Sequence, residues 1–324
     1  MVSKEEFGFF VESLITPQDK QEINSKKKHF IIRMMSIMVA IAAFIVVVSY
    51  FVLIPSINTL GSLVVMVCSI AIFVAVLLSV LIKSLKDVGS KYLMSKYKVE
   101  IVNYLMNSFV KYVYNPQMTI NRKDFEQLRV CGGFDEFSGE DLLTITIPVD
   151  SGDVELNLSD CKAIERVRDK EGREYVRTVY NGIAGFIVFP FKFKCKLALN
   201  NRYHFRFKDV ESYNLEDIKF NNRFSFKTND QFEATHILTP SLMMKLMKIE
   251  QHFKRFGLVL DGNLMVISVP HQQLFAPRSI KKDNYVEAFY PFYEDIVSIT
   301  EIITEIVANK RVIDSRMVDD KNKN

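Results

Sequence analysis

The sequence lacks tryptophan, and between Met34 and Ile82 it also lacks every charged residue and histidine. A helix of about 20 apolar residues crosses the hydrocarbon core of a bilayer. Residues 34–54 and 63–82 each fit that length, and Pro55 to Ser62 supply a turn between them. The stretch therefore predicts a transmembrane helical hairpin.

Signatures of known chemistry are also absent. The sequence has no P-loop, no G-x-G-x-x-G, no H-E-x-x-H and no G-x-S-x-G motif. The four cysteines are widely spaced, without the C-x-x-C pattern of zinc or redox sites, and the five histidines lack metal-ligand spacing. We therefore predict no catalytic, metal-binding or cofactor-binding residue, and no cofactor.

The net charge is only +4, whereas a strongly basic domain is typical of nucleic-acid binding. Nucleic acid is therefore not an expected partner. Positive residues flank both predicted spans and none lies in the turn, so the positive-inside rule places both termini in the cytoplasm. The flanking residues are Lys26, Lys27, Lys28, Arg33, Lys83, Lys86 and Lys91. The expected localisation is the cell membrane, with two spans.

The domain organisation follows from this hairpin. We expect a cytoplasmic amphipathic segment at 1–30, the hairpin at 31–85, a membrane-proximal helical region at 86–130, an α+β cytoplasmic domain at 131–318 and a disordered tail at 319–324. In the first segment, Phe7, Phe10, Val11 and Leu14 share one helical face. That helix either lies on the membrane or packs on the cytoplasmic domain.

The α+β domain is expected to contain a mostly antiparallel sheet. Apolar residues alternate with polar ones from Leu143 onward, as in half-buried strands. Residues 169–172 and 261–263 are charged or glycine-containing turns that predict two hairpins. Thr239 and Pro240 form a helix start, with Thr239 as N-cap. Near the C-terminus, the isoleucines at 296, 299, 303 and 306 predict a buried helical stripe.

Several segments of the α+β region resemble one family. These are Phe137–Asp141, the hairpin from Arg166 to Tyr180 with the following Asn181-Gly182-Ile183, Val210-Glu211-Ser212 and, most specifically, Asn229–Pro240. The sequence resembles the bacterial family called domain of unknown function 3137. The resemblance implies a short N-terminal helix, two membrane helices and a cytoplasmic α+β domain, but no activity. The sequence departs from the family pattern at Thr235-His236, where a basic and then an aromatic residue are expected.

A basic strand face is the sharpest local feature. Lys192, Lys194 and Lys196 alternate with apolar residues, and Arg206 is expected nearby. One interpretation is that these side chains are solvated or protect a sheet edge from aggregation. The other is that they face lipid, because each basic residue near an anionic membrane adds roughly 1 kcal/mol to the binding free energy. Asp230 and Glu233, which precede the helix at Thr239, are interpreted as structural rather than catalytic.

Three functional hypotheses follow. The first is a membrane-anchored interaction module that binds a protein partner or orients on the bilayer lipids. The second is a membrane-tethered enzyme of unrecognised chemistry, which requires a cleft lined by Asp230, Glu233 or His236. The third is an oligomeric transport component. The spans contain no ionisable residue, only sparse serines such as Ser36 and Ser69, so an anchor is favoured over a pathway.

Overall fold

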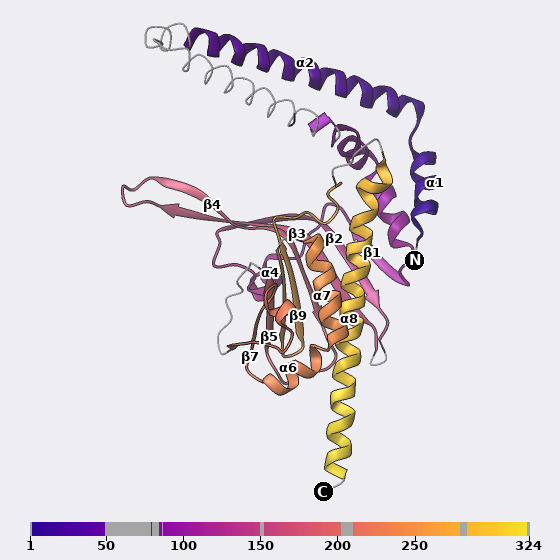
Figure 1. Ribbon diagram of the computed structural model, residues 1–324, viewed down its shortest axis with the longest axis vertical. Helices are drawn as coiled ribbons and strands as arrows, with labels where there is room; N and C mark the ends of the chain where they lie inside the picture. The colour runs from indigo at the N-terminus through magenta and orange to yellow at the C-terminus, as the bar shows by residue number, and fades with distance from the viewer. Residues whose placement is uncertain are drawn as a thin grey trace. The chain divides into compact units, whose positions relative to one another are not determined.

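The computed structural model (Figure 1) describes residues 2–48, 79, 84–85, 87–149, 152–201, 210–253, 255–278 and 284–322. The chain divides into two compact units. The first, the sheet unit, comprises Val102–Ala276 and Phe292–Asn324 together with Met1. The second, the helical unit, comprises Val2–Ile101 and Pro277–Pro291.

The described part of the sheet unit contains a nine-stranded antiparallel sheet in the order β1-β2-β3-β4-β9-β8-β5-β7-β6. This confirms the predicted α+β class and antiparallel pairing. In sheet order the strands are β1 (Lys111–Asn115), β2 (Glu136–Ile147), β3 (Val154–Arg168), β4 (Glu174–Val188), β9 (Leu264–Pro270), β8 (Phe256–Asp261), β5 (Leu197–Asn201), β7 (Ser225–Thr228) and β6 (Glu211–Tyr213).

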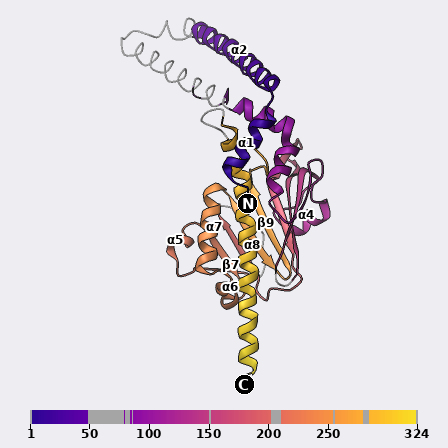
Figure 2. The ribbon, with the colours of Figure 1, turned by 90° about the vertical axis from the view of Figure 1, so that its right-hand side faces the viewer.

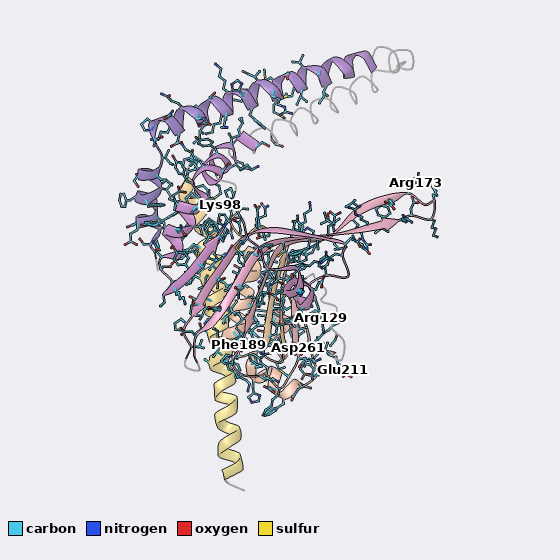
Figure 3. The ribbon with its side chains drawn as sticks, turned by 180° about the vertical axis from the view of Figure 1, so that it is seen from behind. Lys98, Arg129, Arg173, Phe189, Glu211 and Asp261 are labelled. Atoms are coloured by element: carbon cyan, nitrogen blue, oxygen red, sulfur yellow. The ribbon has the colours of Figure 1, made fainter. Side chains whose placement is uncertain are left out.

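Both predicted hairpins are present, at β3–β4 and β8–β9. Gly172 and Gly262 occupy their turns with positive φ angles of 82° and 61°, a conformation that costs glycine little. The β3–β4 hairpin continues beyond Ile164, the last β3 residue that β2 pairs. It extends away from the rest of the sheet unit (Figure 1), and Arg173 lies at its far end (Figure 3).

Five helices of the sheet unit lie within the described residues. They are α4 (Arg122–Leu128), α5 (Ile218–Asn221), α6 (Gln231–Ile237), α7 (Pro240–His252) and the greater part of α8 (Tyr285–Asn322). The predicted isoleucine stripe of α8 is buried, and so are Leu242, Leu246 and Ile249 on α7. Figure 1 shows α7 and α8 in front of the strands, and Figure 2 shows these two helices side by side. Positions 319–322, where a disordered tail is expected, continue α8.

The helical unit contains α1 (Lys4–Leu14), α2 (Pro17–Val48), a helical segment through residues 87–101 and the first turns of α8. Phe7 and Val11 of α1 are buried. The Phe7 ring lies 5.9 Å from the ring of Tyr290, whose hydroxyl donates a hydrogen bond to the Val2 carbonyl. The apolar face of α1 therefore packs on the first turns of α8, within the helical unit.

Asp19 is the polar centre of the helical unit. Its Oδ2 accepts hydrogen bonds from the Thr16 backbone and hydroxyl, and its own N–H donates to Thr16 Oγ1, so the two residues cap α2. Tyr97 and Tyr92 also donate to this fully buried carboxylate, and Lys96 forms an ion pair with it. These contacts join the start of α2 to the helix at 87–101.

The predicted transmembrane hairpin is wrong. Among the described residues, no helix has both the length and the apolar composition needed to cross a bilayer. This finding also contradicts the expected two-span cell-membrane localisation. α2 enters the first predicted span, and its first half is charged. Residues 49–54 of that span lie outside the described residues. Of the second predicted span, residues 63–82, only Ser79 belongs to the described residues.

Candidate functional site

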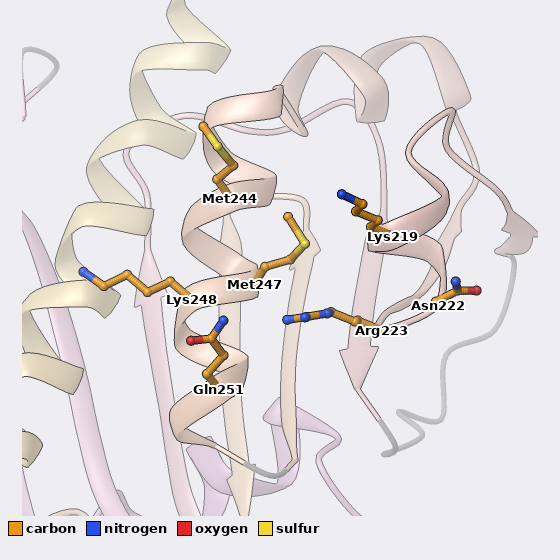
Figure 4. A pocket seen from close by; sticks show the side chains of 7 residues that line it. All are labelled: Lys219, Asn222, Arg223, Met244, Met247, Lys248 and Gln251. Carbon is orange, nitrogen blue, oxygen red and sulfur yellow. The ribbon is translucent and has the colours of Figure 1, made fainter.

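A groove between α5 and α7 is the candidate site. Its volume is about 500 Å³. The side chains that line it come from the two helices and the residues that follow α5 (Figure 4). They are Lys219, Asn222, Arg223, Met244, Met247, Lys248 and Gln251. The described lining thus contains three cations, two neutral amides and two methionines, and no acidic residue.

The α7 side of the groove is a mixed polar and apolar helix face. Met244, Met247, Lys248 and Gln251 recur at helical spacing, so they share one face. Met244 is 62% exposed, which is unusual for a large apolar side chain beside a depression. The opposite face of α7 is buried, so α7 is held by the core and presents its groove face outward.

Hydrogen bonds fix the start of α7. Thr239 is its N-cap, and Thr239 Oγ1 accepts from the Leu242 N–H at 3.3 Å, while Pro240 occupies the first turn. Asn309 of α8 donates to Thr239 Oγ1 and to the Ile237 carbonyl. The helix start at Thr239 and Pro240 therefore joins α6, α7 and α8.

Ion pairs fix the body of α7. Lys245 forms an ion pair with Glu305 of α8, and His252 Nδ1 lies 2.7 Å from Asp295 Oδ1. Burial alone would raise the pKa of Glu305, but hydrogen bonds from Lys245, Ser241 and Thr239 outweigh it and lower that pKa. Glu305 therefore stays ionised at neutral pH and holds α7 against α8.

Local hydrogen bonds position the α5 side. Asp217 caps α5 through the backbone N–H groups of Lys219 and Phe220. Phe220 is fully buried and stacks on Phe224 at a ring distance of 4.9 Å. Arg223 donates to Glu250 of α7 at 3.3 Å, and this ion pair links the two sides of the groove.

The segment that was predicted as a basic strand does not have strand conformation. Residues 192–196 precede β5 rather than forming a strand. The Lys194 N–H donates to Glu233 Oε1, and the Lys196 N–H donates to Asn229 Oδ1. Side-chain acceptors thus replace a strand ladder here. Lys192 and Lys194 are exposed and Lys196 is half-buried, whereas Arg206 lies outside the described residues. None of the three lysines lines the groove.

The acidic residues before α7 have structural contacts. Asp230 is the N-cap of α6, and its Oδ1 accepts from the Glu233 N–H. Glu233 is buried, and Oε1 lies 4.0 Å from the Nζ of buried Lys310. His236 Nδ1 contacts the Phe232 carbonyl at 2.8 Å. Burial, and then the charges of Glu233 and Asp230, raise the pKa of the Cys195 thiol to about 12, so this thiol is un-ionised at neutral pH.

Three carboxylates from β2 and β3 lie close together. Oxygen atoms of Glu140, Asp141 and Asp160 all lie within 4.8 Å of one another, a spacing that could hold a cation. Asp141 is 1% exposed, and its Oδ1 accepts from the Tyr114 hydroxyl. Asp160 Oδ1 accepts from the Leu274 N–H. Asp160 is distant in sequence and joins the pair only through β2–β3 pairing, so no sequence motif marks this cluster.

A second depression, of about 340 Å³, lies beside α4. It is lined by Phe125, Glu126, Arg129, Cys131, Gly132, Gly133 and Phe134. Neither this depression nor the groove between α5 and α7 is lined by Asp230, Glu233 or His236. These two depressions therefore do not provide the cleft that the enzyme hypothesis requires.

Comparison with known proteins gives one family match, over part of the chain. No curated protein matches the sequence. Among solved structures, the chain is similar to the mycobacterial trehalose monomycolate transport factor A, TtfA, with 6% identity, 64% of this chain and 92% of that chain covered, and a TM-score of 0.38. A likeness this weak supports no functional argument. Residues 178–307 match the family described as "Protein of unknown function (DUF3137)". These residues include the groove, and the match confirms the family resemblance over this part of the chain.

Proposed function

We propose that this protein is an interaction module that binds a partner protein in the groove between α5 and α7. The observation that carries the proposal is the exposed methionine face of α7 beside cationic side chains. Methionine is flexible and polarisable, and it is frequent at surfaces that adapt to partner proteins. A mixed apolar and polar lining is also typical of recognition sites.

The rigidity of α7 supports the same proposal. Thr239, Lys245 and His252 join the helix to α8 along its length. A binding face that is already ordered loses less conformational entropy when a partner docks. The groove face of α7 is thus arranged before binding.

A photo-crosslinking experiment tests this function. p-Benzoylphenylalanine is placed at Met244 in the full chain, and at exposed Met118 as the matched control. The protein is irradiated in cells that express it natively, and crosslinked partners are identified by mass spectrometry. The proposal predicts one recurrent partner from position 244 that is absent from position 118.

The groove itself is then blocked. Met247→Trp adds bulk to the lining, so it should reduce the crosslinking yield from position 244 while leaving the circular dichroism spectrum unchanged. Equal yields from positions 244 and 118, or a yield that Met247→Trp does not change, would overturn the proposed function.

Lipid contact through the lysines at 192–196 stays a prediction. Lys196 Nζ lies 3.8 Å from Asp261, so its charge is partly balanced within the sheet unit. Lys192 and Lys194 are exposed beside it. Binding of the full chain to vesicles containing phosphatidylglycerol, lost in the Lys192→Glu/Lys194→Glu variant, would support this contact. Equal binding to neutral vesicles would count against it.

A further inference from the structure

Building on the proposed protein-binding function, we infer that the groove recognises an acidic segment that carries an aliphatic anchor residue. Three properties of the lining point to this class of partner. They are its uncompensated positive charge, its methionine pair and its amide side chains.

The positive charge is only partly balanced. Arg223 pairs with Glu250, which also accepts a hydrogen bond from Asn201. Among the described residues, neither Lys219 nor Lys248 has an ion-pair partner, and both are exposed. These two lysines come from opposite sides of the groove (Figure 4). A carboxylate-rich segment in the groove would be attracted by both charges.

The apolar part of the lining is small. Met244 and Met247 lie one turn apart on α7 and flank the groove. A volume of about 500 Å³ suits a short segment rather than a folded surface. Leucine, isoleucine or methionine of a partner would therefore bury against these two flexible side chains.

The remaining lining residues suit a peptide backbone. Asn222 and Gln251 each offer a carbonyl acceptor and an NH₂ donor. Among the described residues, the lining contains no aromatic side chain on which a base would stack, and stacking is a main contribution to single-stranded nucleic-acid binding. An acidic polypeptide segment is thus the occupant that the groove fits best.

Fluorescence anisotropy with defined peptides tests the inference. The probe is a labelled twelve-residue peptide of alternating glutamate and leucine, titrated with the full chain at low ionic strength. In one matched peptide every glutamate is replaced by lysine, and in the other every leucine is replaced by serine. We expect the glutamate–leucine peptide to bind at least about tenfold more tightly than either matched peptide. The lysine peptide is repelled by the cations of the groove, and the serine peptide lacks the aliphatic anchor.

Charge reversal in the groove provides the second arm. Lys219→Glu/Lys248→Glu should weaken binding of the glutamate–leucine peptide by about tenfold or more. The charge-matched control, Lys123→Glu/Lys162→Glu, changes two exposed lysines outside the lining and should bind like the unmodified protein. Equal affinities for the acidic and basic peptides, or equal effects of the two double variants, would overturn the inference.

The two proposals fail differently. If only the acidic specificity is wrong, position 244 still crosslinks its partner, and Lys219→Glu/Lys248→Glu leaves that yield unchanged. If the binding function is wrong, position 244 yields no groove-dependent partner at all.

Discussion

At the residue scale, Glu233 and Lys310 form a charged pair inside the sheet unit. Their side chains are 1% and 4% exposed, and the closest N–O distance is 4.0 Å. Within the described part of the chain, Glu233 Oε2 has no hydrogen-bond partner. The attraction between two such charges offsets the cost of their desolvation incompletely. Removal of one member leaves the other charge buried without its partner. Neither member lines the groove. The pair links α6 to α8, and its role is to fix their placement rather than to add net stability.

Lys310→Met should lower the free energy of unfolding by about 3–5 kcal/mol, because the Glu233 carboxylate loses its counter-charge. Urea unfolding followed by circular dichroism measures this change. The double variant Glu233→Gln/Lys310→Met should recover much of the loss, and Lys248→Met, at an exposed lysine, serves as control. Equal stability of the Lys310→Met and Lys248→Met proteins would refute the role assigned to this pair.

At the element scale, local signals predicted more than long-range ones. The turn residues at 169–172 and 261–263 predicted both hairpins, and Thr239-Pro240 marked the start of α7. Pairing of β4 with β9 and of β5 with β8 joins residues far apart in sequence, which no local pattern encodes. Alternation at 192–196 misled because side chains, not a neighbouring strand, accept those backbone hydrogen bonds.

The groove was missed for a related reason. α5 has four residues, too few for a periodic signal. Its Lys219 meets Met244 and Lys248 only after α5 and α7 are brought together by the sheet. The start of α7 was predicted correctly, whereas its outward methionines gave no sign of a partner on their own.

Gly139 in β2 sets a close approach between elements. A Cβ atom there would collide with the Asp160 carbonyl and with Thr119 Oγ1. We therefore predict that Gly139→Ala lowers the free energy of unfolding by about 1–3 kcal/mol through overpacking. Gly133→Ala is the matched control, because nothing lies within 4 Å of a Cβ at that position. Thermal unfolding of the two variants compares them directly, and similar midpoints would show that β2 and its neighbours relax without cost.

At the scale of the whole molecule, the two units are stabilised by different interactions. The sheet unit combines a buried apolar core with strand pairing. The helical unit also depends on the network at Asp19. Burial of Asp19 would raise its pKa, but hydrogen bonds from Lys96, Thr16 and Tyr97 outweigh this and hold the pKa well below its usual value. A hydrogen bond to Glu22, then burial, raises the pKa of Tyr92 to about 12.

The depressed pKa of Asp19 gives the helical unit a defined pH dependence. Its contribution to stability is fully present above the unfolded pKa of about 3.9, and it is lost as pH falls towards the folded pKa. Asp19→Asn should therefore lower the thermal midpoint at pH 7, and the difference from the unmodified protein should shrink below about pH 4. Glu12→Gln, at an exposed carboxylate of α1, should leave the midpoint unchanged. A difference for Asp19→Asn that stays constant down to pH 2.5 would contradict this account.

Hydrogen–deuterium exchange tests the central claim, partner binding in the groove, most directly. The full chain is compared with and without a stoichiometric amount of the partner identified by crosslinking. The account predicts slower exchange at residues 218–223 and 240–252, with the β3–β4 hairpin at 164–179 unchanged. Slower exchange at 164–179, with α5 and α7 unchanged, would contradict it.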